Sequence, residues 1–330
     1  MDVLSDVIAL MRTGRPNTAR VTWHGTWGQR FPSVPGAAGF QVILKGACWL
    51  IPPESDPGAA PVPLAAGDVV FFPHGEPYGL ADSPGTPLAV TDCDPLTEQP
   101  ARFATNTVGS TVGSTVGGTV GSGPEAVITL CGGYQLDPRH AHPLLHDLPG
   151  LIHIPGPRGD AAPAAAGLHA LVEVLGREMD EPRLGTDTVI PALLDTLLLF
   201  ILRAWLEERP TGDDATGWAA ALTDPPVSAA LRAMHREPDR PWTVESLGRA
   251  AGMSRAAFSA RFTALVGRPP LTYLTWWRMT LAARQLRESD LGLARIAAGV
   301  GYSSEFAFGT AFKRAYGIAP GRYRQAAQGG

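Results

Sequence analysis

The chain has 330 residues, of which 45% are hydrophobic and 18% are charged, with a formal net charge of -4. This composition predicts two domains with buried cores and excludes a chain that is disordered throughout. The first 20 residues contain no long apolar run after a basic start, so we expect no signal peptide and a cytoplasmic protein. The three widely spaced cysteines form neither a metal motif nor a disulfide framework, which fits a reducing compartment.

Charge is unevenly distributed along the chain. Residues 222–330 contain 15 Lys or Arg and 7 Asp or Glu, a balance of +8. Residues 1–221 contain 12 basic and 24 acidic residues, a balance of -12, which restores the net -4. A basic C-terminal part is typical of a module that binds a polyanion, and chance clustering on a solvated surface explains the charges about equally well.

Short apolar runs between Gly and Pro turns fill the first 155 residues. Four runs have the length of β-strands, at residues 40–44, 48–51, 68–72 and 127–130. Many short strands with such turns predict a sandwich or barrel. A Thr-Val-Gly-Ser repeat at 107–123 is too rich in Gly to pack well. We expect a flexible insertion there, with extended, strand-like structure as the alternative.

Helical spacing begins after Pro163. Apolar residues within 168–175 form one face, and those within 193–205 form a broader one. The two helices are expected to pack on each other, on the barrel or on a second subunit. We therefore predict a helical dimerisation and linker segment at 161–210. The most apolar stretch, 189–206, contains a proline and two charged residues, which predicts a buried helix rather than a membrane span.

A self-similarity at a spacing of 50 residues marks the C-terminal part. The clearest matched pairs are Ser254 with Ser304, Phe258 with Phe308, Phe262 with Phe312, and Gly267 with Gly317. Each copy predicts a short helix, a Gly-containing turn, a capping Ser, and a second helix that buries two Phe and ends at a Gly. In the second copy, Ser303 and Ser304 both suit the cap. Such helix-turn-helix units offer the second helix to the major groove of DNA.

A connecting helix is predicted at 271–286. Its residues, at roughly 1.5 Å each, span roughly 24 Å. With the packing of each unit added, the two second helices can reach successive major-groove turns, which lie about 34 Å apart. We therefore predict a DNA-binding domain at 219–330 with double-stranded DNA as its partner.

Three motifs stand near the C-terminus: Gly-Tyr-Ser-Ser-Glu-Phe at 301–306, Phe-Lys-Arg at 312–314, and Gly-Ile-Ala-Pro-Gly-Arg-Tyr-Arg at 317–324. With them, residues 242–324 resemble the DNA-binding domain of the AraC/XylS family of bacterial transcription regulators. The resemblance implies that the exposed side of each second helix contacts bases. The residues at those positions are Arg255, Ala256, Ser259 and Ala260 in the first copy, and Glu305, Phe306, Ala307 and Thr310 in the second.

The chemistry of these positions is uneven. Glu305 can accept from a cytosine amino group, Thr310 can bond a base edge, and Ala or Phe can meet a thymine methyl group. The two alanines of the first helix predict a small hydrogen-bonding contribution there. Four basic residues are expected to hold phosphates instead, namely Lys313, Arg314, Arg322 and Arg324. For Arg249 and Arg261, a solvated face and a phosphate contact are equally expected.

Residues 67–78 resemble the second cupin motif, and residues 40–49 resemble the first cupin strand pair. The chain is therefore similar to regulators of this family that carry a cupin-type sensor domain, here predicted at 1–160. The fold class expected is α+β, with a cupin-like β-barrel and following helices before an all-α domain. That domain holds two helix-turn-helix units joined by a long helix.

Gln41 and Tyr78 stand where cupins often have metal-binding His, so no metal and no cofactor are expected. His140, His142 and His146 are expected to be surface or capping residues rather than a metal cluster. The barrel can still bind a small molecule in its mouth. By analogy to the fold, five residues are candidates to line this effector pocket: Trp23, Gln41, Trp49, His74 and Tyr78. The alternative is a barrel filled by side chains that serves as a dimerisation platform.

The leading hypothesis is a sequence-specific DNA-binding transcription regulator, not an enzyme, that is modulated by a small molecule. We expect a homodimer, with RNA polymerase as a further partner and no membrane. One alternative is a cupin-type enzyme with a DNA-binding tail, which would need metal ligands or a paired acid and base. Another is a redox sensor acting through Cys48, Cys93 or Cys131. Cys93 lies between two aspartates, whose charge raises a thiol pKa.

Overall fold

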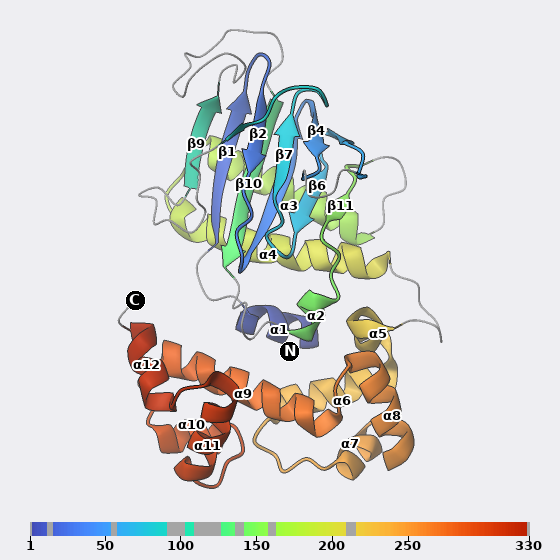
Figure 1. Cartoon of the computed structure of the whole chain (residues 1–330), viewed down its shortest axis with the longest axis vertical. Helices are drawn as coiled ribbons and strands as arrows, with labels where there is room; N and C mark the ends of the chain where they lie inside the picture. Colours follow the sequence, from blue (N-terminus) through green and yellow to red (C-terminus); the bar gives the residue numbers. More distant parts are fainter. Residues whose placement is uncertain are drawn as a thin grey trace. The chain divides into compact units, whose positions relative to one another are not determined.

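A computed structural model describes residues 2–11, 16–53, 58–90, 103–108, 127–135, 142–157, 163–208 and 216–328. Its contacts divide the chain into two compact units. Unit 1 comprises Met1–Met11, His142–Asp147 and Pro210–Gly330, and unit 2 comprises Arg12–Ala141 and Leu148–Arg209. Two short segments of the range predicted as one sensor domain therefore belong to unit 1 (Figure 1). Most of the Thr-Val-Gly-Ser repeat, and Cys93 and His140, lie outside the described residues.

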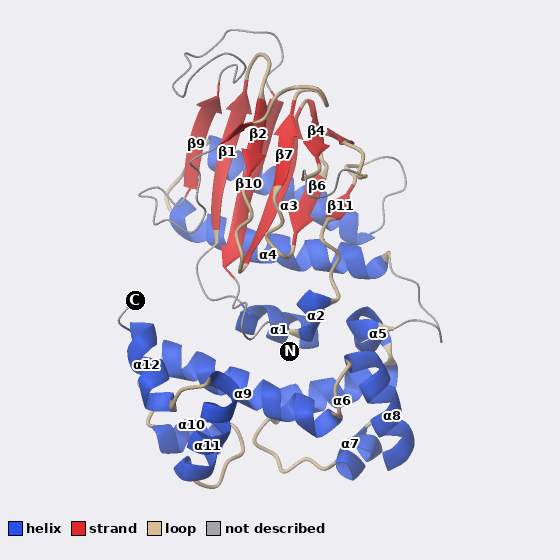
Figure 2. Cartoon of the chain, in the orientation of Figure 1, coloured by secondary structure: helices blue, strands red, loops and turns tan. Residues whose placement is uncertain are grey.

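Unit 2 contains two β-sheets (Figure 2). The first has the strand order β11-β6-β3-β10-β1-β9, and the second has the order β5-β4-β7-β2-β8. The bounds are β1 Asn17–Trp23, β2 Gly28–Phe31, β3 Ala37–Lys45, β4 Ala47–Ile51, β5 Val62–Ala65, β6 Val69–Phe72, β7 Tyr78–Ala81, β8 Ala89–Val90, β9 Phe103–Val108, β10 Val127–Gln135 and β11 Ile152–Ile154. The four strands predicted from the apolar runs correspond to β3, β4, β6 and β10, which confirms the β-rich first part.

The core of unit 2 is built from both sheets. Its buried residues are Val21, Trp23, Ile43, Val70, Phe72 and Val127 from the first sheet and Cys48, Leu50, Leu64 and Leu80 from the second. Alternation along β4 sends Cys48 and Leu50 inward, because successive side chains of a strand point to opposite faces. Burial of the apolar side chains between two sheets is the packing of a sandwich or barrel.

Two helices cover the other face of the six-stranded sheet, α3 (Pro163–Asp180) and α4 (Thr186–Glu207) (Figure 2). The Tyr134 hydroxyl of β10 donates to the Leu194 carbonyl oxygen of α4 at 2.6 Å. Gly176 of α3 lies against the Leu44 side chain of β3. Since β3 is covered on both faces, its residues are buried almost continuously rather than alternately.

The apolar faces predicted for these helices are buried within unit 2. They include Leu168, Val172 and Leu175 of α3 and Leu194, Leu197, Leu198, Ile201, Leu202 and Trp205 of α4. They pack inside the subunit, so they are not free to form the dimer seam that was one expectation. Among the described helices, α4 alone is long and apolar enough to cross a membrane by length and composition. Its buried face is what a core helix of the unit requires.

The C-terminal part of unit 1 is entirely helical among its described residues. Its helices are α5 Gly217–Thr223, α6 Pro225–Arg236, α7 Val244–Ala250, α8 Arg255–Val266, α9 Pro270–Glu288, α10 Leu293–Gly299, α11 Glu305–Tyr316 and α12 Pro320–Gln328. The two predicted helix-turn-helix units are α7–α8 and α10–α11, and α9 is the predicted connecting helix. Two further helices of this unit precede them in the chain, α1 (Val3–Met11) and α2 (Pro143–His146).

Both helix-turn-helix copies use the same local devices. The Ser254 hydroxyl accepts from the Ala257 amide at the start of α8, and the Ser304 hydroxyl accepts from the Ala307 amide at the start of α11. Ser304, not Ser303, is therefore the cap in the second copy. Both helices end at a glycine in the left-handed region, with φ of 75° in α8 and 78° in α11. A non-glycine residue is strained in that conformation, which explains the repeated Gly.

Candidate nucleic-acid interface

The first recognition helix, α8, separates a buried face from an exposed face. Phe258 and Phe262 are fully buried, as predicted. Among the predicted base-contacting residues of this helix, Arg255, Ala256 and Ala260 are exposed and Ser259 is half-buried. The exposed positions cluster in the first turns of the helix, the part that meets base edges in helix-turn-helix proteins. Apart from Arg255, the face offers only methyl groups and one hydroxyl.

The second recognition helix, α11, exposes a richer set of groups. Its predicted base-contacting residues are all exposed, namely Glu305, Phe306, Ala307 and Thr310. Phe306 has 86% of its surface exposed while Phe308, two residues on, has none. The Phe306 ring therefore lies on the outer side of α11, whereas Phe308 faces the core. The Thr310 hydroxyl donates to the Phe306 carbonyl oxygen at 3.0 Å and keeps its lone pairs for a donor.

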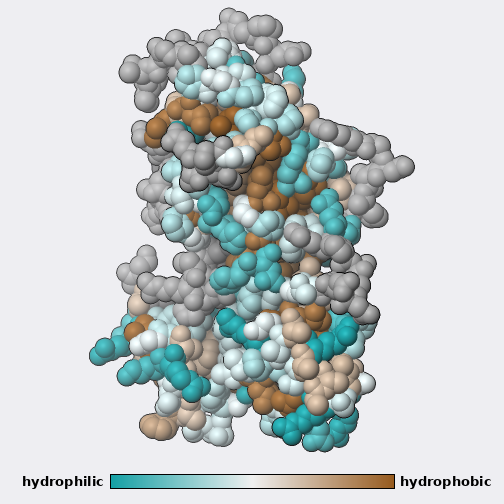
Figure 3. Space-filling view, turned by 45° about the vertical axis from the view of Figure 1, so that its right-hand side comes forward, coloured by the Kyte–Doolittle hydropathy of each residue, from teal (hydrophilic) through white to brown (hydrophobic). Residues whose placement is uncertain are grey.

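The four predicted phosphate contacts fall into two groups. Lys313 and Arg314 of α11 and Arg322 of α12 are exposed. Arg324 is half-buried, and its guanidinium donates to the Leu291 carbonyl oxygen before α10. Arg324 therefore ties α12 to the second helix-turn-helix unit, whereas the other three leave their charges in solvent. Hydrophilic side chains cover much of unit 1 on the face drawn in Figure 3.

Arg261 is used inside the first unit. Its guanidinium pairs with the carboxylate of Asp224, whose other oxygen accepts from the Val227 amide at the start of α6. The Arg261 side chain is 46% exposed and that of Asp224 only 6%. Asp224 thus holds α8 and α6 together. Arg249 forms only an exposed pair with Glu245, four residues earlier on α7. Of the two expectations for Arg261, neither included this ion pair.

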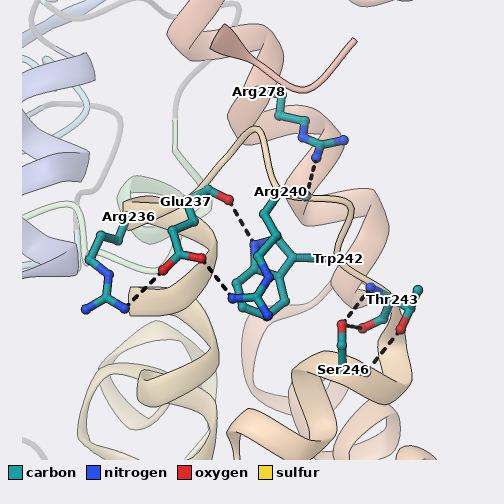
Figure 4. A network of polar contacts seen from close by, with 7 residues as sticks. All are labelled: Arg236, Glu237, Arg240, Trp242, Thr243, Ser246 and Arg278. Carbon is teal, nitrogen blue, oxygen red and sulfur yellow. Dashed lines mark hydrogen bonds and ion pairs between the residues drawn. The ribbon is translucent and has the colours of Figure 1, made fainter. Parts of the chain in front are cut away.

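A polar network fixes the loop between α6 and α7 (Figure 4). The Trp242 indole donates to the Glu237 carbonyl oxygen at 2.9 Å, and the Arg240 guanidinium lies over the Trp242 ring at 4.2 Å. Hydrogen bonds from Arg240 and then Arg236 lower the pKa of the Glu237 carboxyl. From α9, Arg278 donates to the Arg240 carbonyl oxygen at 2.8 Å. The loop that leads into the first recognition unit is therefore anchored on the connecting helix.

The same arginine touches the turn of the second unit. Gly301, with φ of 78°, lies so close that an added Cβ would come within 2.7 Å of the Arg278 guanidinium and 2.8 Å of the Asp239 carbonyl oxygen. The equivalent turn glycine of the first copy, Gly252, has nothing within 4 Å of such a Cβ. Arg278 is thus wedged between the two recognition units. Sequence reasoning missed it, because nothing local in 271–286 distinguishes a wedge from a solvated arginine.

In unit 2 the structure brings together only some of the predicted effector residues. Gln41 is fully buried and donates its side-chain amide to the Tyr78 hydroxyl at 2.8 Å. Trp23 is buried in the same core, and its indole donates to Thr129 at 2.9 Å. Trp49 is half-buried and, one residue from inward-facing Cys48, points to the opposite face of its sheet.

His74 is also apart from this group. It is exposed, and its Nε2 lies 2.9 Å from the Leu148 carbonyl oxygen. Asp68, in the cupin-like motif, is fully buried and accepts from the Gly156 and Ala65 amides. The beginning of that motif therefore supports the turn rather than a ligand. No group of three or more His, Cys, Asp or Glu is placed to hold a metal ion within the described part of the chain.

The described cysteines have no reactive setting. Burial, followed by the charge of Asp68, raises the pKa of the Cys48 thiol to about 12. Cys131 is half-buried, and its Sγ lies 3.5 Å from the Ala19 carbonyl oxygen. A reactive thiol needs a lowered pKa and access to solvent. These two residues therefore give the redox-sensor alternative no support.

Two family models match the chain, a cupin model over residues 2–207 and a helix-turn-helix domain model over residues 247–326. Their order agrees with the sheets of unit 2 and the paired recognition units of unit 1. Together they define the class: a DNA-binding transcription regulator with a cupin-type domain before its helix-turn-helix domain.

Known relatives specify the family. A Streptomyces antibioticus protein described as an AraC-like transcription regulator is 35% identical over 326 residues, which cover 98% of this chain and 99% of that protein. The HTH-type transcriptional regulator AlkR of Acinetobacter baylyi is 37% identical over 190 residues, 58% of this chain and 60% of AlkR. A crystal structure of the DNA-binding domain of AdpA in complex with a target DNA is 33% identical, covers 32% of this chain and 95% of that chain, and gives a TM-score of 0.31. The chain belongs to the AraC-like family of transcription regulators.

Proposed function

We propose that this regulator binds its operator by placing α8 and α11 in successive major grooves of double-stranded DNA. The observation that carries the proposal is the shared design of the two helices, each of which buries two Phe and exposes the opposite face. The connecting helix α9 has 19 residues. At 1.5 Å per residue it spans roughly 28 Å, close to the spacing of about 34 Å between groove turns.

We assign base contacts to one set of residues on the recognition helices and phosphate contacts to a second set, which is basic and exposed. The proposed base contacts come from Arg255, Ala256, Ser259 and Ala260 of α8 and from Glu305, Phe306, Ala307 and Thr310 of α11. The proposed phosphate contacts come from Lys313, Arg314 and Arg322. Arg324, whose guanidinium already bonds a carbonyl oxygen, acts on DNA by holding α12 in place. Base contacts supply sequence preference, and phosphate contacts supply affinity that falls with salt.

A small-molecule effector is proposed to bind beside Gln41 and Tyr78. The Gln41 Oε1 atom is buried without a hydrogen-bond partner among the described residues. If the amide is rotated, the NH₂ group is left in the same position, so one polar atom stays unsatisfied in either orientation. An unpaired buried polar atom destabilises a fold by about 1–3 kcal/mol. A ligand that pairs with it would recover that energy.

The proposal includes a homodimer that acts in the cytoplasm and contacts RNA polymerase, with no enzymatic reaction. Exposed apolar residues on the α3–α4 hairpin, Val174, Leu184 and Val189, support self-association. Paired subunits would place two DNA-binding modules on repeated half-sites. Sedimentation of the full chain at micromolar concentration, with and without DNA, tests this part: a monomer in both samples contradicts it.

The experiment that tests DNA recognition is selection of bound sequences from a randomised pool by the full chain. We expect enriched DNA with two short conserved blocks separated by about one helical turn, roughly 10 base pairs. Affinity for the enriched DNA should fall steeply as salt rises. A pool that returns unenriched after repeated rounds contradicts the proposal.

A further inference from the structure

Two segments that lie outside the C-terminal range are packed into the DNA-binding unit. Helix α1 buries Val3, Leu4, Val7 and Ile8, and it contacts α6 and α9. Helix α2 buries Pro143, Leu144 and Leu145, and it contacts α5 (Figure 1). The chain passes from α1 directly into unit 2. It leaves unit 2 just before α2 and returns to it after Asp147. These two helices are therefore covalent extensions of the cupin-type module that are docked on the DNA-binding unit.

A continuous chain of hydrogen bonds holds both helices. His142 precedes α2, and its Nε2 lies 3.3 Å from the Tyr273 hydroxyl oxygen of α9. The same oxygen lies 2.7 Å from Nε2 of His235 on α6. On the far side, Nδ1 of His235 lies 3.3 Å from the Asp6 carboxylate of α1. The Tyr273 phenol thus connects the imidazole of His142, which caps α2, to the imidazole of His235, which faces α1.

The positions of the protons in this chain are fixed by its ends. His142 Nδ1 accepts from the Leu144 amide at 3.0 Å, so it carries no proton and Nε2 must donate to Tyr273. The Asp6 carboxylate accepts, so His235 Nδ1 carries a proton and Nε2 of the neutral ring is free to accept. Tyr273 then receives from His142 and donates to His235. Every atom is satisfied only while both imidazoles are neutral.

The surroundings favour that neutral state. His142 is fully buried, and desolvation lowers its pKa well below the ordinary value, with the charges of His235, Arg268 and His146 acting in the same direction. Burial also lowers the pKa of His235, while the hydrogen bond from its ring to Asp6 and the Asp6 charge oppose the shift. Because of Asp6, His235 is the imidazole that accepts a proton first as the pH falls.

Aromatic residues close off the site. The His235 ring stacks on Trp277 at 3.6 Å, and the His142 ring meets the edges of Trp218 and Trp276 at 4.2 and 5.1 Å. Burial raises the pKa of Tyr273 well above its ordinary value, so the phenol keeps its proton. A proton added to His235 would turn its Nε2 into a donor. The Tyr273 proton would then have no acceptor on either imidazole.

We propose that the Asp6–His235–Tyr273–His142 chain is a proton-sensitive latch, which docks α1 and α2 on the DNA-binding unit when both imidazoles are neutral and releases them on acidification. A histidine with a lowered pKa binds fewer protons when docked than when released, so acid favours release. The stabilisation by docking is complete above about pH 6.5, the pKa of a free imidazole. It is lost as the pH falls from there towards the lowered values.

Release of α1 and α2 should also affect the first recognition helix, α8. The Tyr273 ring packs against Phe262 of α8 with ring centroids 6.0 Å apart. At the end of α2, the Asp147 carboxylate accepts from the Trp218 amide at 2.7 Å, at the start of α5, which packs on α8. Loss of α1 and α2 removes support from the frame that positions α8. DNA binding should therefore weaken with the same pH midpoint as release.

Hydrogen exchange of the full chain tests the latch without DNA or effector. After correction for the intrinsic exchange rate, protection of amides in α1 and α2 should fall by about tenfold or more between about pH 7.5 and about pH 5. Amides of β3 and α11 should stay protected, which excludes general unfolding. Equal protection of α1 and α2 at both pH values overturns the proposal.

A pair of variants separates gating from simple structural support. Asp6→Asn keeps a hydrogen-bond acceptor but removes the charge that favours protonated His235, so the pKa of docked His235 falls further and acid should favour release more strongly: the fall in protection between about pH 7.5 and about pH 5 should be larger than in the wild type. Ala9→Ser alters an exposed position on α1, the helix that carries Asp6, and should leave the pH dependence of protection unchanged. An unchanged or smaller fall in protection in Asp6→Asn, or an equal change in both variants, contradicts the latch.

Discussion

The two helix-turn-helix units share one scaffold and differ on the surface that meets DNA. Ser254 and Ser304 cap α8 and α11 in the same way, and both helices end at left-handed glycines. The exposed face of α8 is made mostly of methyl groups, and its Arg261 is engaged by Asp224. The face of α11 presents a carboxylate, an exposed aromatic ring and free basic residues.

The difference indicates a division of labour on a duplicated frame. The first unit is braced by neighbouring helices, so we expect it to contribute shape and methyl contacts, and we expect the second to supply most of the polar base recognition. Caps, glycines and buried Phe maintain the frame, so they recur in both copies. Substitutions at matched positions should therefore have equal effects in the frame and unequal effects on the exposed faces.

The largest effect is expected at the buried phenylalanines. Phe258→Ala and Phe308→Ala each leave a cavity at a fully buried position and should lower the free energy of unfolding of unit 1 by about 3–5 kcal/mol. Phe306→Ala, at an exposed position, should change it by no more than about 0.5 kcal/mol. Tryptophan-fluorescence unfolding measures all three. A large loss in Phe306→Ala would show that its ring packs within the fold.

Substitutions in the second helix-turn-helix unit should impair base recognition more than substitutions in the first. Glu305→Ala removes an exposed acceptor and should weaken binding to the preferred DNA by about 1–3 kcal/mol while relaxing preference at one base position. Ser259→Ala, at the half-buried hydroxyl of α8, should have a smaller effect. Competition binding against single-base variants of the selected DNA measures both. Equal losses from the two variants would contradict the division of labour.

The turn glycines should respond unequally to a methyl group. Both Gly252→Ala and Gly301→Ala place a side chain at positive φ, which destabilises by about 1 kcal/mol. In Gly301→Ala the new Cβ also displaces Arg278, so stability should fall further and DNA affinity should fall with it. Thermal unfolding and DNA titration of the two variants provide the comparison. Indistinguishable variants would show that the Arg278 wedge does not couple the two units.

The smallest effects are expected from substitution of Arg322 and Arg324, which have different proposed roles. Arg322→Ala should weaken binding to all DNA sequences alike and reduce the slope of log affinity against log salt by about one, without loss of stability. Arg324→Ala removes the bond to the Leu291 carbonyl oxygen and should lower thermal stability instead. Salt-dependent titration and melting of each variant distinguish the roles. A salt-slope change confined to Arg324→Ala would reverse the assignment.

Local signals were sufficient to predict the paired units. The 50-residue spacing, the capping Ser and the terminal Gly act within a few residues of one another, so the sequence carries them directly. The buried phenylalanines followed from helical spacing in the same way. The helix α9, predicted at 271–286 and found at Pro270–Glu288, begins directly after Pro269 and ends directly before Ser289.

Long-range partners could not be predicted. Asp6 and His235 are separated by 229 positions, and Arg324 and Leu291 by 33. The sequence of α2 shows a proline and two leucines but not that they belong with α5, so residues 1–160 were expected as one domain. His142 was expected to be a surface or capping residue. It does cap α2, and its full burial against Tyr273 depends on packing that no local pattern encodes.

The central claim is that α8 and α11 recognise one DNA site together, and its most direct test is sequence selection with the full chain and its Glu305→Ala variant. The account predicts that the wild type enriches two conserved blocks about one helical turn apart. The variant should relax only the block that α11 contacts. Enrichment of a single block that is unchanged by Glu305→Ala would contradict the account.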